Sequence, residues 1–288
     1  AQMEQAYQQM QRKLRITKLD EDIKHKVMVL SGKGGVGKST VATGLALCLA
    51  RRGMRVGLMD IDITGPNVPK MLGIDEAELD VEDGQIHPAP GPHGLKVISM
   101  AFLLEDPDKP VIWRGPIKLG AIQQFIGDVA WGELDALIID FPPGTSDEPL
   151  TVSQNLPGID GVVIVTTPQE VALLDSRKSI NFAKTLSVPV LGVVENMSGF
   201  ICPNCDIRHD IFGSGGAESQ ATEMKIPVLG TIPIHIPIRI NGDGGQTASN
   251  LQEESSQPWF ESLARTLVQQ LATAAAAEPP QPQLPILS

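Results

Sequence analysis

A glycine-rich segment near the start of the chain constrains the fold more strongly than any other feature. SGKGGVGKST (residues 31–40) follows the apolar run KVMVL and runs into STVATGLALCLARR, whose apolar residues have helical periodicity. The spacing G-x-x-x-x-G-K-[ST] between a strand and a helix is typical of a loop that binds nucleotide phosphates. Its glycines let successive backbone N–H groups face phosphate oxygens, and the helix N-terminus adds positive potential. A glycine-rich turn with a surface lysine is the alternative, which the flanking strand and helix disfavour.

The residues of this loop have expected contacts with a nucleotide and its Mg²⁺. Lys38 is placed for the β- and γ-phosphates, the Ser39 hydroxyl for Mg²⁺, and Thr40 for the α-phosphate. The sequence therefore predicts a nucleotide site. The other residues expected to line this site are Gly32, Lys33, Gly34, Gly35, Val36 and Gly37.

Short apolar segments recur along the chain and alternate with segments of helical periodicity. Strands that are apolar on both faces and separated by helices indicate a mostly parallel sheet covered on both sides. We therefore expect an α/β fold, with a twisted, mostly parallel sheet and helices on both faces, that binds ligands at the carboxyl ends of its strands. The strands are predicted at 26–30, 55–60, 95–100, 135–140, 161–167, 190–197 and 228–234, and the helices at 116–131, 169–186, 218–224 and 260–271.

The two ends of the chain differ in composition from its centre. Residues 1–24 are expected to form an N-terminal helical or flexible segment, and residues 25–273 a single domain. The tail at 274–288, AAAAEPPQPQLPILS, is of low complexity and is expected to be disordered. Segment 74–95 is acidic and rich in Pro and Gly, which indicates an insertion with a small hairpin.

The composition of the chain excludes several classes of protein. A net charge of −11 disfavours sequence-independent binding of nucleic acid. The apolar runs are too short to span a bilayer, and the first 26 residues lack the apolar region of a signal peptide. Three cysteines are too few for a disulfide scaffold. These features predict a cytoplasmic protein without a nucleic-acid or membrane partner.

Carboxylates stand at the ends of two predicted strands. Asp60 and Asp62 come at the end of one strand, and Asp140 ends another. An apolar strand that ends in Asp is the Walker B arrangement, so Asp140 is expected to orient a Mg²⁺-bound water. A carboxylate at the other strand end can hold Mg²⁺ through water or position the attacking water.

Further polar residues beyond the strands are candidates for contacts with the nucleotide. Thr145 and Asp147 form either a switch facing the γ-phosphate or an ordinary turn or helix cap. Asn196 has an amide that donates and accepts, as adenine recognition requires, although an asparagine in a turn is the alternative. No N-K-x-D guanine motif is present, so ATP is favoured over GTP. Pro233 is expected to lie against the base.

The segment CPNC contains two of the cysteines, Cys202 and Cys205. Thiolates are the soft ligands that iron–sulfur clusters and Zn²⁺ prefer, and Pro203 stiffens a turn that can direct both sulfurs the same way. A four-coordinate site needs two more ligands. Zinc in the same site, a mononuclear zinc site with His209 as third ligand, and a redox dithiol are the alternatives, and His209 is otherwise an ordinary loop histidine. Cys48 is expected to be a small buried apolar residue.

The loop KGGVGKST carries a second lysine, Lys33, and resembles the deviant Walker A signature of nitrogenase iron protein, the MinD/ParA ATPases and the ATPase that targets tail-anchored proteins. In that class the early lysine reaches the partner's nucleotide in a homodimer. The resemblance implies an ATP-dependent dimer, while a solvated surface lysine is the alternative for Lys33. It also implies that Asp62 positions the attacking water, that Asp60 lies near the Mg²⁺ shell and that Asn196 recognises the base. The catalytic residues that it implies are Lys33, Lys38, Asp62 and Asp140.

Several motifs in order resemble the Mrp/ApbC family of ATPases that carry iron–sulfur clusters. They cover roughly residues 25–245 and comprise KGGVGKST, DIDITGPNVPKMLG, WRGP, IIDFPPGTSDEPLT, ENMSGFICPNC and IFGSGG. The resemblance implies a slow, homodimeric ATPase whose Cys202 and Cys205, from two chains, hold a bridging [4Fe–4S] cluster for delivery to apo-proteins. A two-fold axis near the loop brings each residue close to its mate. Residues 1–47 contain no cysteine, unlike the N-terminal cluster of the eukaryotic scaffolds, which favours the simpler prokaryotic type.

Two other functions share parts of this pattern. A positioning ATPase of the MinD/ParA kind needs a basic amphipathic helix that binds membranes or a basic DNA surface. Residues 274–288 contain no Lys or Arg, which disfavours a basic membrane anchor at that end. An electron-donating reductase of the nitrogenase iron-protein kind also bridges a cluster, but it takes one cysteine from each of two separated segments rather than two from a CxxC.

Overall fold

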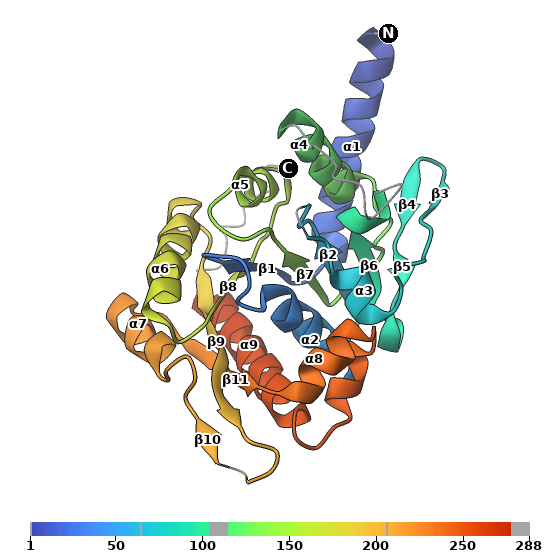
Figure 1. The fold of residues 1–288 in the computed structure, drawn as a ribbon. Helices are drawn as coiled ribbons and strands as arrows, with labels where there is room; N and C mark the ends of the chain where they lie inside the picture. The colour runs from blue at the N-terminus through green and yellow to red at the C-terminus, as the bar shows by residue number, and fades with distance from the viewer. Residues whose placement is uncertain (1, 64, 104–114, 206, 278–288) are drawn as a thin grey trace.

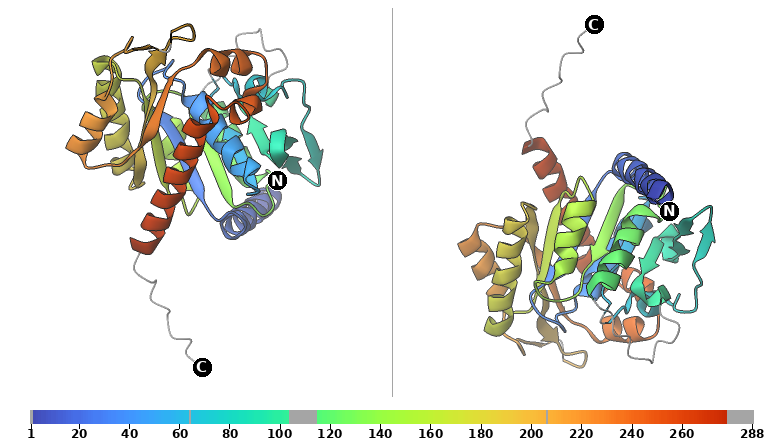
Figure 2. Two further views of the ribbon diagram at one scale, coloured as in Figure 1. Left: turned by 90° about the horizontal axis from the view of Figure 1, so that it is seen from below. Right: turned by 90° about the horizontal axis from the view of Figure 1, so that it is seen from above.

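The computed structural model describes residues 2–63, 65–103, 115–205 and 207–277 of the chain. A central sheet lies between two layers of helices (Figures 1 and 2). The predicted α/β class and mostly parallel sheet are therefore confirmed. Trp113 and Arg114 of the WRGP motif, and residues 278–288 of the expected tail, lie outside the described residues.

The sheet consists of β1 (Lys26–Ser31), β2 (Val56–Asp60), β5 (Ala89–Pro90), β6 (Lys96–Ser99), β7 (Ala136–Asp140), β8 (Gly161–Thr166), β9 (Val190–Ile201), β10 (Arg208–His209) and β11 (Val228–Ile234). Its order is β10-β9-β8-β1-β7-β2-β6-β5, and β11 pairs with β9. β5 and β10 are antiparallel to their neighbours, and the other pairings are parallel. β1 lies between β7 and β8, so the loop that follows it opens at the centre of the carboxyl edge.

Helices cover both faces because the central strands are apolar on both sides. Along β1, Val27 and Val29 belong to one core, and Met28 and Leu30 belong to the other. This alternation follows from the two-residue period of a strand. The first core packs against α2 (Lys38–Arg51), α3 (Val68–Leu72), α8 (Ile236–Asp243) and α9 (Gln257–Ala277), and the second against α1 (Gln2–Asp22), α4 (Gly115–Gly127), α5 (Asp147–Asn155), α6 (Glu170–Thr185) and α7 (Gly216–Met224).

The predicted insertion at 74–95 does contain a hairpin, formed by β3 (Asp80–Glu82) and β4 (Gln85–His87). The helix predicted at 116–131 is shorter than expected, because α4 ends at Gly127. The following residues bond to the hairpin instead: Ile86 N donates to Asp128 O at 2.8 Å, and Ala130 N donates to Ile86 O at 2.9 Å. These contacts between distant segments are not visible in the local periodicity.

Two further boundaries differ from the prediction, and two helices were not predicted. β9 continues to Ile201 rather than ending at residue 197, because β10 and β11 pair with its outer half. α9 continues through Ala277, so residues 274–277 of the expected tail are helical. α5 and α8 were not predicted as helices, because each is short and includes a proline near its start. Among the described residues, no helix is long and apolar enough to cross a bilayer.

Candidate functional site

The glycine-rich segment forms a loop between the end of β1 and the first residue of α2, Lys38. Gly35 and Gly37 have φ angles of 79° and 80°, which side chains with a Cβ rarely adopt. A Cβ at Gly37 would lie 2.1 Å from Asn196 Nδ2, and one at Gly32 would lie 2.2 Å from the backbone carbon of Asp175. Two of the glycines are therefore required by close approach of β9 and α6 as well as by the turn itself.

This loop lines a cavity of about 300 Å³ at the carboxyl edge of the sheet. Every predicted loop residue from Lys33 to Thr40 lines it, and so does Asp62. Sequence reasoning missed Gly65, Asn67 and Met71, which also line the cavity. They lie in the segment after β2 and on α3, and the only sequence signal was that this segment follows the carboxylates.

The carboxylates named from the sequence lie around Lys38. Lys38 Nζ is 2.6 Å from Asp140 Oδ1 and 3.9 Å from Asp62 Oδ2, and it donates to Ser39 Oγ at 3.3 Å. The two contacts with carboxylates follow from β1, β2 and β7 being neighbours with aligned ends: Asp60 pairs in register with Asp140. The fold thus brings together residues that lie about a hundred positions apart in the sequence.

Asp140 and Asp60 are both completely buried, yet their surroundings differ. Burial raises the pKa of Asp140, while the contact with Lys38 opposes this rise. Burial and the neighbouring Asp140 raise the pKa of Asp60 to about 8. Asp60 accepts hydrogen bonds on both oxygens, from Ser99 Oγ at 2.7 Å and from Asp62 N at 3.1 Å.

The Asp140 carboxylate has an oxygen that suits a cation. Its Oδ2 atom is buried and makes no hydrogen bond to any part of the chain that the structure describes. An ionised, unpaired carboxylate oxygen in a buried site is unfavourable unless a cation or donor approaches it. Asp140 and the Ser39 hydroxyl therefore fit the donor set for Mg²⁺, whereas Asp60 is already engaged with protein groups.

Asn196 lies within β9 rather than at a strand end, because the strand continues beyond it. Its Nδ2 atom donates to Val36 O in the phosphate loop at 2.8 Å. Pro233 follows Ile232, which is paired in register with Asn196. The structure thus places Asn196 against the phosphate loop and Pro233 beside it on β11, and the adenine contacts expected of both residues stay predictions.

The CPNC segment forms the tip of the hairpin between β9 and β10, which projects from the body of the protein (Figure 1). Cys202 N donates to Ile207 O at 3.0 Å and closes the turn. Cys205 is exposed, Cys202 is partly exposed, and the two are not joined in a disulfide. The thiols are therefore presented at the surface, as expected from a loop that follows a strand.

The described residues of the cysteine tip do not form a complete set of metal ligands within one chain. No group of three or more His, Cys, Asp or Glu residues able to hold a metal occurs among the residues described. His209 pairs with Phe200 on the hairpin stem, so the mononuclear zinc site with His209 as a third ligand is not formed. Cys48 is buried in the core between α2 and the sheet, as predicted, and burial raises the pKa of its thiol.

A buried carboxylate that sequence reasoning missed anchors this hairpin. Glu195 is 1% exposed and accepts from Ser198 Oγ at 2.6 Å, Ala217 N at 2.7 Å and Gly215 N at 3.3 Å. It therefore ties β9 to the N-terminus of α7, where the chain returns from the hairpin. The signal in the sequence was a charged residue inside the apolar run VLGVVENM, since a buried charge needs partners.

Asp147, the residue expected in a switch or cap, is the first residue of α5. The next residue, Glu148, is buried and forms an ion pair with Lys118 Nζ at 2.6 Å. Burial alone would raise the pKa of Glu148, but the Lys118 contact lowers it. This pair links α5 to α4, and sequence reasoning did not identify it.

Comparison with known proteins identifies the family. A ParA family model described as "NUBPL iron-transfer P-loop NTPase" matches residues 22–270. The "Iron-sulfur cluster carrier protein" of Methanocaldococcus jannaschii is 49% identical, with 86% of each chain covered. The "Cytosolic Fe-S cluster assembly factor NUBP2 homolog" of Nematostella vectensis is 47% identical and covers 84% of this chain and 90% of its own.

Solved structures agree with these relatives. A nucleotide-binding protein of Archaeoglobus fulgidus in complex with ADP superposes with a TM-score of 0.74 at 40% identity, covering 86% of this chain and 95% of its own. The cell division ATPase MinD of Pyrococcus furiosus has a TM-score of 0.62 at 24% identity, covering 85% and 98%, and so shares the fold. The resemblance to P-loop iron–sulfur carriers is confirmed, and the chain belongs to the ParA family of NUBPL-type iron-transfer P-loop NTPases.

Proposed function

We propose that this protein is a cytoplasmic, homodimeric carrier that binds and slowly hydrolyses ATP. Two chains would hold a bridging [4Fe–4S] cluster between them and transfer it to apo-proteins. The observation that carries this proposal is the exposed CPNC tip, whose two cysteines have no third metal ligand among the described residues of the chain. A second copy supplies the two missing thiolates, because a two-fold contact brings each residue close to its mate.

The nucleotide half of the proposal is supported by the cavity around the phosphate loop. Loop N–H groups and Lys38 would bind the phosphates, and Lys33 would reach the nucleotide of the partner chain. Asp62 lines the cavity and would position the attacking water. The relative from Archaeoglobus fulgidus was solved in complex with ADP, which favours a nucleotide here.

Ser39 and Asp140 are the residues suited to hold the metal ion, and Asp60 lies beside Asp140 on the neighbouring strand. When bound, Mg²⁺ neutralises charge on the β- and γ-phosphate oxygens. Lys38 would exchange its contact with Asp140 for a phosphate oxygen, which leaves the carboxylate available to orient a water. Asp60 holds Asp62 in place through the hydrogen bond from Asp62 N.

Strand β9 offers a physical connection between the nucleotide and the cysteines. Asn196 bonds the phosphate loop, Glu195 bonds the start of α7, and the same strand ends at Ile201, directly before Cys202. Adjacent residues on a strand point to opposite faces, so one strand contacts both groups. A shift of the phosphate loop on nucleotide binding would therefore move the hairpin that carries the thiols.

Metal analysis of two variants tests the proposal. After anaerobic reconstitution, wild-type protein should contain iron and sulfide in the ratio of one [4Fe–4S] cluster per two chains and sediment as a dimer. Cys202→Ala and Cys205→Ala should lose the cluster and retain ATP binding. The matched control is Cys48→Ala, because Cys48 is buried away from the tip. A full iron and sulfide content in Cys202→Ala would exclude the bridging site.

The same preparations separate the proposal from its alternatives. Zinc in place of iron in anaerobically purified protein would favour a structural zinc bridge. A cluster that cycles electrons reversibly but does not pass to an apo-protein would favour a reductase. A positioning ATPase would bind vesicles or DNA in an ATP-dependent manner and contain no cluster.

A further inference from the structure

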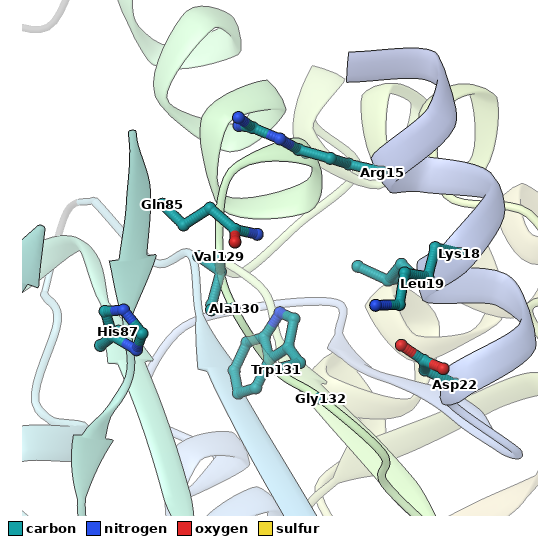
Figure 3. Close-up of a pocket in the computed structure, with 11 residues that line it drawn as sticks. Arg15, Lys18, Leu19, Asp22, Gln85, His87, Val129, Ala130, Trp131 and Gly132 are labelled. Carbon is teal, nitrogen blue, oxygen red and sulfur yellow. The ribbon is translucent and has the colours of Figure 1, made fainter. Parts of the chain in front are cut away.

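A second cavity lies at the edge of the sheet opposite to the phosphate loop, where β1 and β7 begin. The second half of α1, strand β4 and residues 127–132 enclose it, and its volume is about 240 Å³ (Figure 3). Nothing in the proposed ATP and cluster chemistry uses this region.

The walls of this cavity are fixed to one another. Arg15 Nη1 donates to Asp128 Oδ1 at 3.0 Å and to Gly84 O at 3.2 Å, and so joins α1 to both other segments. The backbone bonds of Ile86 to residues 128 and 130 join the hairpin to the third wall. The cavity is therefore held open by contacts from all three sides, as a preformed ligand site requires.

One buried donor without an acceptor lines the cavity, and a second lies beside Gly127 of its wall. Trp131 is 2% exposed and lines the cavity, and its indole Nε1 makes no hydrogen bond with any described residue. In Figure 3 the indole lies between α1 and β4, with its nitrogen directed to the space between them. Arg12, one turn before Arg15, packs against Gly127, and its Nη2 is likewise buried without a partner in the described structure. Buried N–H groups are normally satisfied, so two such donors indicate a missing acceptor.

The charges around the cavity restrict the kind of acceptor. Arg15 is paired with Asp128, and Lys18 is followed four residues later by Asp22, which lines the same cavity. Arg12, Arg15 and Lys18 carry three positive charges and Asp22 and Asp128 two negative ones, so this group of side chains has an excess of about one positive charge. Leu19 and Val129 supply apolar surface in the same walls. A singly charged ligand with an apolar body therefore fits better than a polyphosphate.

We propose that this cavity binds a small monocarboxylate. One carboxylate oxygen would accept from Trp131 Nε1, the charge would lie near Lys18 and Arg12, and the apolar body would pack on Leu19 and Val129. The site is separate from the nucleotide cavity and does not depend on the proposed carrier function.

Indole N–H resonances in protein labelled with ¹⁵N-tryptophan test this site directly. The chain has three tryptophans, and Trp131→Phe identifies the Trp131 signal. Titration of the full-length protein with benzoate should shift that signal saturably, with a millimolar or lower dissociation constant, and ADP should not compete. Benzyl alcohol has the same body without the charge and should bind at least tenfold more weakly.

Two variants and a matched control complete the test. Lys18→Ala should weaken benzoate binding at least threefold and Arg12→Ala at least fivefold, whereas Lys13→Ala, on the exposed side of the same helix, should not change it. Lys18 is exposed, so its removal does not threaten folding. A shift that does not saturate, equal binding of benzyl alcohol, or unchanged affinity in both variants would each overturn the proposal.

Discussion

Lys38 and Asp140 form an ion pair inside the protein, with 2.6 Å between Nζ and Oδ1 and side-chain exposures of 6% and 0%. The lysine comes from the phosphate loop and the carboxylate from the end of β7, in the middle of the sheet. The attraction offsets part of the desolvation of both charges. Because Lys38 is the loop's expected phosphate ligand, we expect nucleotide binding to replace its buried carboxylate partner by a phosphate oxygen.

Lys38→Ala should therefore weaken ATP binding strongly. A hydrogen bond to a charged group contributes about 1.5–3 kcal/mol, which corresponds to a loss of roughly 10- to 150-fold in affinity. Titration calorimetry of the variant measures the change. Lys184→Ala, an exposed lysine near the end of α6, is the control and should bind ATP as the wild type does. Equal affinities in both variants would remove Lys38 from the phosphate site.

The raised pKa of Asp60 predicts a pH dependence of stability. Its pKa is about 8 in the folded protein, against an ordinary value of 3.8 for an aspartate in water, so between pH 4 and pH 8 the folded state binds more protons than the unfolded state. Stability from this group is therefore present at low pH and declines as the pH rises through that window, by at most about 1.4 kcal/mol per pH unit.

Asp60→Asn isolates this contribution, since an amide can replace both hydrogen bonds of the carboxyl group without titrating. The free energy of unfolding, measured by urea denaturation from pH 4.5 to pH 8, should fall less steeply in the variant than in the wild type. Asp75→Asn, in an exposed position after α3, serves as the control and should preserve the wild-type slope. Parallel curves for wild type and Asp60→Asn would mean that Asp60 is ionised throughout this range.

Much of the fold was predictable because its signals are local. The strands have continuous apolar runs, and the phosphate loop has its own glycine spacing, so each could be recognised from a short segment. The clustering of Asp60, Asp62 and Asp140 followed from the rule that parallel strands meet at one edge. The strands, the phosphate loop and the cluster of carboxylates could therefore be inferred from short segments and one geometric rule.

The contacts that sequence reasoning missed join segments that are distant in the chain. The end of α4 at Gly127 depends on bonds from Ile86 of the inserted hairpin. The length of β9 depends on pairing with two later strands. The engagement of Asp60 by Ser99 depends on β6 lying beside β2, which the chain order alone does not specify. In each case tertiary pairing overrode the local pattern.

The hydrogen bonds of Glu195 predict that its removal lowers stability and alters the cysteine hairpin. Glu195→Ala leaves the buried Ser198 hydroxyl and the buried Ala217 N–H without their acceptor, and it also removes the acceptor of the Gly215 N–H. The expected loss in the free energy of unfolding is about 1–3 kcal/mol. The rate at which a maleimide modifies the cysteines should also change, because the N-terminus of α7, where the chain returns from the hairpin, is no longer bonded to β9.

The control for Glu195 is Glu218→Ala, which removes an exposed carboxylate from the first turn of α7. It should lower stability by less than about 1 kcal/mol, as expected for a charge near a helix N-terminus. If both variants lose the same stability, the buried network does not anchor the hairpin.

Two glycines of the phosphate loop make a matched pair for the last prediction. A Cβ at Gly32 would lie 2.2 Å from the backbone carbon of Asp175, whereas one at Gly34 would meet only Pro143 Cγ, at an ordinary 3.7 Å. Gly32→Ala must therefore push the loop away from the backbone of α6, and overpacking of this kind costs about 1–3 kcal/mol. Gly34→Ala has no such clash and should lie within about 0.5 kcal/mol of the wild type. Thermal unfolding without nucleotide measures the stability of both variants. The two variants carry the same substitution at different positions of one loop. A similar melting temperature for the two would therefore show that contact with α6 does not fix the loop.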